Sequence, residues 1–202
     1  MLKTPQHLGV FLWYDYFMQA NQTYMNFGLI AAVITVMGLL FLVRKWPKGS
    51  QYTFSQHSAA HKASTIYYSA LFAVMLPLLL LFFIQWFIPT FKLSIWFTIL
   101  IVLSAATQFT CTLVPESGGL KSKYHRLLAG CSAVLLLPAM YILIVSGNIT
   151  TSMTMLAFTM LGIMLGITTF LAVAKGAHKY LLFLQAGYFA CFVAAILGIT
   201  YI

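Results

Sequence analysis

Long apolar runs alternate with short polar links along the chain. Six runs stand out, at about residues 24–43, 66–88, 93–114, 127–145, 153–174 and 180–202. An α-helix rises about 1.5 Å per residue, so about 20 apolar residues cross the hydrocarbon core of a bilayer. The pattern therefore predicts an all-α integral membrane protein, in which residues 1–202 form a single polytopic six-helix bundle.

The composition agrees with a bilayer as the solvent. Apolar residues make up 62% of the chain and charged residues only 6%. These charged residues are too few to cover the surface of a water-soluble domain. The segment before the first run, residues 7–20, is aromatic and apolar but carries Asp15. It is too short to span a bilayer alone, so we expect it either to extend the first helix or to lie at the interface.

The basic residues predict the orientation. The chain has 11 lysines and arginines against two acids, Asp15 and Glu116. Nine of the basic residues lie in the links after the first, third and fifth runs: Arg44, Lys45, Lys48, Lys62, Lys121, Lys123, Arg126, Lys175 and Lys179. Because lysine and arginine are enriched in cytoplasmic loops, we place these links in the cytoplasm and both termini outside. No nucleic-acid-binding motif accompanies the charge, so we expect no nucleic acid partner.

The link between the third and fourth runs, residues 115–126, is the most distinctive polar stretch. Pro115, Gly118 and Gly119 predict a turn, and Ser122 is a candidate cap for the helix that follows. Glu116 is the only acid on the basic side. We therefore expect it to form a structural ion pair with Lys121, Lys123, Arg126 or a neighbouring link.

The same link contains the candidate binding site. His125 and Arg126 open the fourth run, where the positive end of the helix dipole favours anions. Together with Lys123 and Lys121 they form a basic cluster at the level of the lipid headgroups. We predict that these four residues bind the headgroup of an anionic phospholipid.

Histidines on the basic side suggest an alternative, a membrane enzyme that depends on a metal or a haem: His57, His61, His125 and His178. On one helix, the spacing of His57 and His61 would place both imidazoles on the same face. Only this one HxxxH pair is present, and HExxH is absent. We therefore expect no cofactor and interpret these residues as loop and interfacial histidines.

A second alternative is a small permease or channel. The strongest polar groups inside the runs are Gln85, Gln108 and Gln185, and no charged residue lies well inside any run. Ion-coupled pumps usually need an intramembrane carboxylate or histidine, so this alternative ranks last. No serine or cysteine nucleophile motif is present, and the cysteines are interpreted as buried free thiols: Cys111, Cys131 and Cys191.

Small residues predict close packing of helices. Gly162 and Gly166 form a GxxxG pair in the fifth run, and the sixth run has a four-residue repeat of Ala186, Ala190, Ala194 and Gly198. Such stripes let helix backbones approach closely in lipid. We expect them to pack helices within the chain, because six helices have many internal interfaces. Contact with a second copy or a partner membrane subunit is the alternative.

The helix count and one segment resemble a known family. The segment covers residues 114–129, with Pro115 after the third run and Tyr124-His125-Arg126-Leu127-Leu128-Ala129 opening the fourth. It is similar to a bacterial and archaeal six-helix membrane family that is grouped with the DRAM-type autophagy modulators and the GPI-anchor-remodelling membrane proteins. The resemblance implies a multi-pass protein of a bacterial or archaeal plasma membrane that interacts with lipids or organises the membrane. It implies membrane lipids as partners and no defined reaction.

Overall fold

The computed structural model describes residues 6–114, 116 and 119–202. All regular structure in these residues is helical, and six segments are long and apolar enough to cross a membrane: Gln22–Lys45, Lys62–Thr90, Ile95–Leu113, Gly119–Val145, Thr151–Val173 and Leu181–Tyr201. The predicted all-α, six-helix architecture is therefore confirmed for the described part of the chain.

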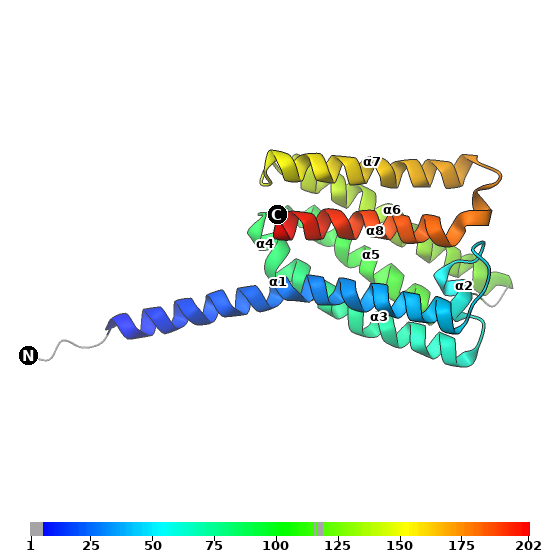
Figure 1. Cartoon of the computed structure of the whole chain (residues 1–202). Helices are drawn as coiled ribbons and strands as arrows, with labels where there is room; N and C mark the ends of the chain where they lie inside the picture. The colour runs from blue at the N-terminus through cyan, green and yellow to red at the C-terminus, as the bar shows by residue number, and fades with distance from the viewer. Residues whose placement is uncertain (1–5, 115, 117–118) are drawn as a thin grey trace, which may run out of the picture.

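The membrane-spanning helices follow one another around the bundle. They are α1 (Gln6–Lys45), α3 (Lys62–Phe82), α5 (Ile95–Leu113), α6 (Gly119–Val145), α7 (Thr151–Val173) and α8 (Leu181–Tyr201). Each packs against the next, and α8 returns to contact α1 (Figure 1). One contact that closes this ring joins the hydroxyl of Tyr201, in α8, to the carbonyl oxygen of Met25, in α1, over 3.2 Å.

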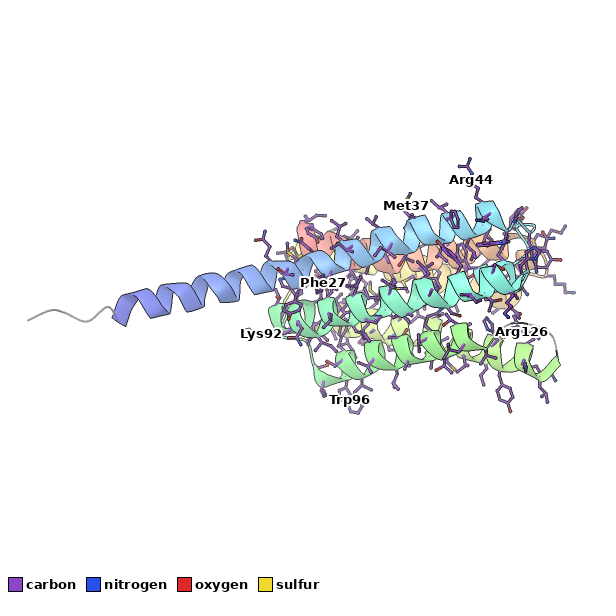
Figure 2. The ribbon with its side chains drawn as sticks, turned by 90° about the horizontal axis from the view of Figure 1, so that it is seen from below. Phe27, Met37, Arg44, Lys92, Trp96 and Arg126 are labelled. Atoms are coloured by element: carbon purple, nitrogen blue, oxygen red, sulfur yellow. The ribbon has the colours of Figure 1, made fainter. Side chains whose placement is uncertain are left out.

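The links with most of the basic residues gather at one end of the bundle, which we call the basic end. Three links form it: the α1–α3 link with the short helix α2 (Phe54–Ser58), the α5–α6 link, and the α7–α8 link with the 3-10 turn η2 (Ala177–Tyr180). Figure 2 shows Arg44 and Arg126 at this end and Lys92 at the other. The links thus alternate between the two ends, as the predicted topology requires.

The first helix is longer than its apolar run. α1 has 40 residues, which corresponds to about 60 Å, whereas the hydrocarbon core of a bilayer is about 30 Å thick. Figure 1 shows its N-terminal part projecting beyond the ends of the other helices, on the side opposite the basic end. Of the two arrangements considered for residues 7–20, the structure has the one that extends the first helix.

The second span changes its helical type near its far end. α3 passes through Pro77 and continues as the π-helical turn η1 (Phe83–Phe87) and the short helix α4 (Ile88–Thr90). The rings of Phe83 and Phe87 are fully buried, with centroids 5.5 Å apart. The adjacent Phe82 ring lies against Gly28 of α1, where a side chain would not fit. This aromatic cluster forms part of the main core of the bundle.

The fourth span begins earlier than predicted. α6 starts at Gly119, which has a φ of +60° and so adopts a conformation that favours glycine, whereas the apolar run begins at residue 127. The first turns of α6 are polar, and they lie at the basic end of the bundle. Ser122 consequently lies within the helix, and its hydroxyl does not cap the helix start.

The predicted packing stripes behave differently from one another. Gly198 of α8 contacts Leu156 of α7, as expected for packing within the chain. A Cβ built at Gly162 or Gly166, by contrast, meets no neighbouring atom within 4 Å among the described residues. Ala190 and Ala194 are also exposed. These four residues lie on the outer surface, because each helix buries a different side. The buried residues of α7 are Ala157, Leu161 and Met164, and those of α8 are Tyr188, Phe192, Ala195, Ile196 and Ile199.

Candidate functional site at the basic end

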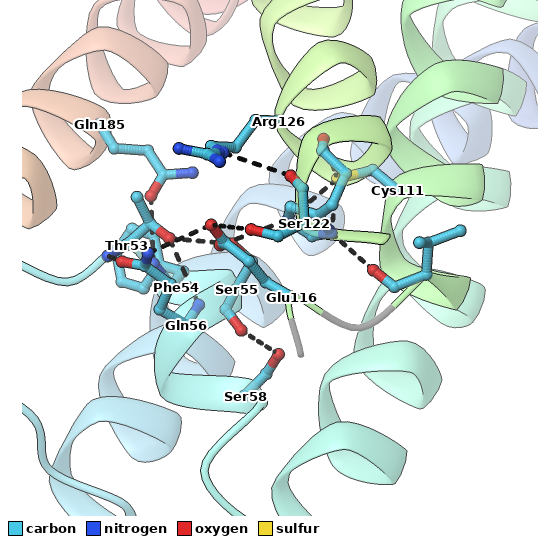
Figure 3. A network of polar contacts seen from close by, with 12 residues as sticks. Thr53, Phe54, Ser55, Gln56, Ser58, Cys111, Glu116, Ser122, Arg126 and Gln185 are labelled. Atoms are coloured by element: carbon cyan, nitrogen blue, oxygen red, sulfur yellow. Dashed lines mark hydrogen bonds and ion pairs between the residues drawn. The ribbon is translucent and has the colours of Figure 1, made fainter. Parts of the chain in front are cut away.

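A buried carboxylate lies at the centre of the basic end. Glu116 follows α5, and its side chain is only 6% exposed. Its oxygens accept hydrogen bonds from the hydroxyl of Ser55 at 3.2 Å, the amide nitrogen of Gln56 at 3.2 Å and the hydroxyl of Ser122 at 3.3 Å (Figure 3). A buried carboxylate is stable only where donors replace its water shell. Here the donors come from two separate segments, α2 and the start of α6.

The imidazole of His125 completes the surroundings of this carboxylate. Its Nε2 atom lies 3.9 Å from Oε2 of Glu116, and its side chain is 3% exposed. Its Nδ1 atom lies 2.6 Å from the carbonyl oxygen of Val114, which can only accept, so Nδ1 carries a proton and donates it. The sulfur of Cys111 lies 3.4 Å from Nε2. His125 therefore faces the interior of the basic end, and the structure does not present it to lipid headgroups.

The ion pair predicted for Glu116 has a different partner from those expected. Among the side chains that the structure describes, the only one paired with this carboxylate is His125, and the pair is charged when the imidazole is protonated. Lys121, Lys123 and Arg126 are exposed instead. The physical reason is burial, since each of these cations would have to leave water to reach a carboxylate that neutral donors already satisfy.

The donor from Gln56 is held in place by a capping box. The hydroxyl of Thr53 accepts the backbone N–H of Gln56 at 3.3 Å, while the side-chain oxygen of Gln56 accepts the backbone N–H of Thr53 at 2.9 Å. This reciprocal pair starts α2 and leaves the amide nitrogen of Gln56 free to donate to Glu116. The pattern Thr-x-x-Gln is visible in the sequence at residues 53–56, so it could have been recognised as a helix start.

The α1–α3 link is also joined to the start of α8. The hydroxyl of Ser50 donates to the carbonyl oxygen of Lys179 at 3.1 Å, and the backbone N–H of Leu182 donates to the carbonyl oxygen of Ser50 at 3.1 Å. The backbone N–H of Phe54 donates to the side-chain oxygen of Gln185 at 3.1 Å. All three links of the basic end are therefore connected by hydrogen bonds that involve side chains.

The basic residues themselves surround this network on the outside. All nine are exposed, and within the described part of the chain no lysine or arginine lies within ion-pair distance of a carboxylate. Lys45 lies over the rings of Phe41 and Trp46, and Lys48 lies over the ring of Tyr52, all within 5.5 Å of the ring centroids. Among the described residues, the positive charges of the basic end are thus not paired with a carboxylate.

The histidines do not form the arrangement that a metal site requires. His57 lies in the last turn of α2, whereas His61 precedes α3, because the chain turns between the two helices. His57 is fully buried, and its Nδ1 atom lies 3.1 Å from the carbonyl oxygen of Trp46. The side chain of His178 lies outside the described residues. Among the described side chains, no group of three potential ligands is placed to hold a metal ion.

The glutamines do not share one cavity either. Gln85 lies in η1, near the end of the bundle opposite the basic end, and is exposed. Gln185 lies at the start of α8, at the basic end, and is bonded to Phe54. The structure therefore gives no support to a channel lined by Gln85, Gln108 and Gln185.

The comparisons with known proteins found no match to this chain. No family model, no curated protein and no solved structure matches the chain. The resemblance to the six-helix family grouped with the DRAM-type and GPI-anchor-remodelling proteins therefore stays a prediction.

Proposed function

We propose that this protein binds anionic phospholipids at its basic end, and that this end faces the cytoplasm. The observation that carries the proposal is an imbalance of charge. Nine exposed lysines and arginines surround one carboxylate, Glu116, which is buried and already bonded to neutral donors. A basic residue near an anionic membrane surface contributes about 1 kcal/mol to the attraction. The basic end is thus complementary to a negatively charged leaflet.

The buried network supports this proposal by fixing the links relative to one another. Glu116 joins α2 to α6, and Ser50 and Gln185 join the α1–α3 link to α8. Cations held on connected links lose less conformational freedom on binding than cations on independent loops. We therefore interpret the interior of the basic end as the support for a lipid-binding surface.

Native mass spectrometry of the protein in mild detergent tests the proposal. The protein is mixed with equal amounts of dioleoyl phosphatidylglycerol and dioleoyl phosphatidylcholine, and the lipid retained on the chain is identified. We expect phosphatidylglycerol to be retained in preference, with the preference falling as salt is raised. Equal retention of the two lipids would contradict the proposal.

A charge variant and a matched control localise the binding. Replacing Lys121, Lys123 and Arg126 together with glutamine removes three exposed charges from the basic end. We expect the preference for phosphatidylglycerol to fall by about tenfold or more. Lys92→Gln removes an exposed charge from the opposite end, and it is expected to leave the preference unchanged.

A further inference from the structure

Two groups that can only donate hydrogen bonds point toward one another at the basic end. The first is the guanidinium of Arg126, on α6. Its Nε–H donates to the carbonyl oxygen of Ser122 at 3.3 Å, which fixes the direction of the side chain. A guanidinium has five N–H groups, so this bond leaves the four on the Nη atoms for other partners. Figure 3 shows these nitrogens directed toward Gln185.

The second group is the NH₂ group in the side chain of Gln185, on α8. The backbone N–H of Phe54 can only donate, so the atom that it meets at 3.1 Å in this side chain is the amide oxygen. The NH₂ group must then point the other way. In Figure 3 it faces the guanidinium of Arg126. The orientation of this amide is therefore determined by its bond to α2.

The described residues supply no acceptor for these donors. No hydrogen bond from the Nη atoms of Arg126 or from the amide nitrogen of Gln185 to an acceptor is present among the described residues. The nearby carboxylate of Glu116 is occupied by three donors and lies beside His125. Arg126 is exposed and Gln185 is partly exposed, so these donors are open to a ligand with several oxygens, and an arginine fork matches a phosphate in particular.

The length of α6 leads us to expect the site at the depth of a lipid headgroup. α6 has 27 residues, or about 40 Å, so it is longer than a hydrocarbon core of about 30 Å. Arg126 lies in its first, polar turns, and Gln185 lies in the first turns of α8, next to the α7–α8 link. The two helices are held together below the site, where the hydroxyl of Tyr188 donates to the carbonyl oxygen of Ala133 at 2.6 Å.

We infer that Arg126 and Gln185 form a discrete phosphate site, which takes the phosphate of an anionic phospholipid between α6 and α8. This inference rests on the proposed function and narrows it, since it assigns the recognition to one pair of residues and not to the sum of nine charges. It adds Gln185, which is uncharged, to the candidate residues.

Two variants with the same change in charge test the site. Gln185→Glu keeps an oxygen for Phe54 but replaces the NH₂ donor with a carboxylate oxygen, while Lys123→Gln removes one exposed cation. Each lowers the net charge by one. Retention of phosphatidylglycerol in native mass spectra is expected to fall about tenfold more for Gln185→Glu than for Lys123→Gln. Equal losses would overturn the site and leave the proposed function standing, whereas no preference in the unchanged protein would overturn both.

A second pair keeps the charge constant and covers the case in which Gln185→Glu fails to fold. Arg126→Lys loses the planar fork, and Lys123→Arg gains one elsewhere. We expect retention to fall severalfold for Arg126→Lys only, and equal retention by the two variants would overturn the site. A third measurement tests binding of inorganic phosphate. If the protein binds inorganic phosphate at the site and retains no phosphatidylglycerol, the ligand is not a lipid and the inference is overturned.

Discussion

The Nε2 atom of His125 lies 3.9 Å from Oε2 of Glu116, with both side chains almost completely buried at one end of a membrane-spanning bundle. The carboxylate also holds Ser55 and Gln56, which are about 60 positions away in the sequence. The two residues therefore form the centre of a tertiary contact that closes the basic end. Its energetic importance can be measured through either partner.

Removal of the carboxylate is expected to destabilise the bundle. Glu116→Ala leaves the donors of Ser55, Gln56 and Ser122 without their acceptor inside the protein, at a cost of about 2–4 kcal/mol. Glu116→Gln keeps one acceptor oxygen, so its cost is expected to be less than half as large. Thermal unfolding in detergent measures both, with Lys92→Ala as the control. A Tm for Glu116→Ala equal to that of the unchanged protein would show that the network contributes nothing.

The capping box of α2 makes a smaller, separable contribution. Thr53→Ala removes the hydroxyl that accepts the N–H of Gln56, and the loss of such a cap costs about 1 kcal/mol. Thr53→Ser retains the hydroxyl and is expected to keep most of the stability. The same unfolding assay compares the two variants. If Thr53→Ser is as destabilised as Thr53→Ala, the hydroxyl is not the stabilising group.

The spans could be predicted because the length and hydropathy of an apolar run are enough to identify a membrane-spanning helix. Each of the six apolar runs corresponds to a helix, and the basic links lie at a common end. The same signal does not specify how a helix is rotated about its own axis. For this reason the exposed positions of Gly162 and Gly166 differ from the expectation, since a GxxxG pair shows that close packing is feasible but not that a neighbour lies there.

The candidate site could be predicted only in part. The link that contains Glu116, His125 and Arg126 was recognisable from its polar residues. Their roles depend on tertiary contacts that the sequence does not show. Ser55 and Gln56, from another link, donate hydrogen bonds to the carboxylate of Glu116, and the lysines and Arg126 of its own link are exposed. The sequence places Gln185 inside an apolar run, whereas in the structure its oxygen is bonded to Phe54 at the basic end.

The three cysteines are expected to react at different rates. Cys111 is buried beside His125, Cys191 is half-buried and Cys131 is exposed on α6, contrary to the interpretation of all three as buried. In detergent, N-ethylmaleimide should therefore modify Cys131 first and Cys111 last, because the reagent must reach the sulfur. Intact masses of variants that retain one cysteine each give the order. Rapid modification of Cys111 in the folded protein would contradict the closed basic end.

Two glycines provide a matched test of which helix surfaces are packed. A Cβ at Gly28 would come within 2.8 Å of the Phe82 ring, which is completely buried, whereas a Cβ at Gly162 meets nothing within 4 Å in the described part of the chain. Gly28→Ala is therefore expected to destabilise the protein by about 1–3 kcal/mol through overpacking. Gly162→Ala is expected to be neutral or to stabilise by up to about 1 kcal/mol, because alanine favours the helix.

Since Gly28→Ala and Gly162→Ala are the same substitution in the middle of a helix, the difference between their unfolding free energies in detergent isolates the packing contribution. A loss for Gly162→Ala as large as that for Gly28→Ala would mean that the outer surface of α7 is covered in the detergent-solubilised protein, and size-exclusion chromatography with light scattering would then identify a second copy as the covering partner.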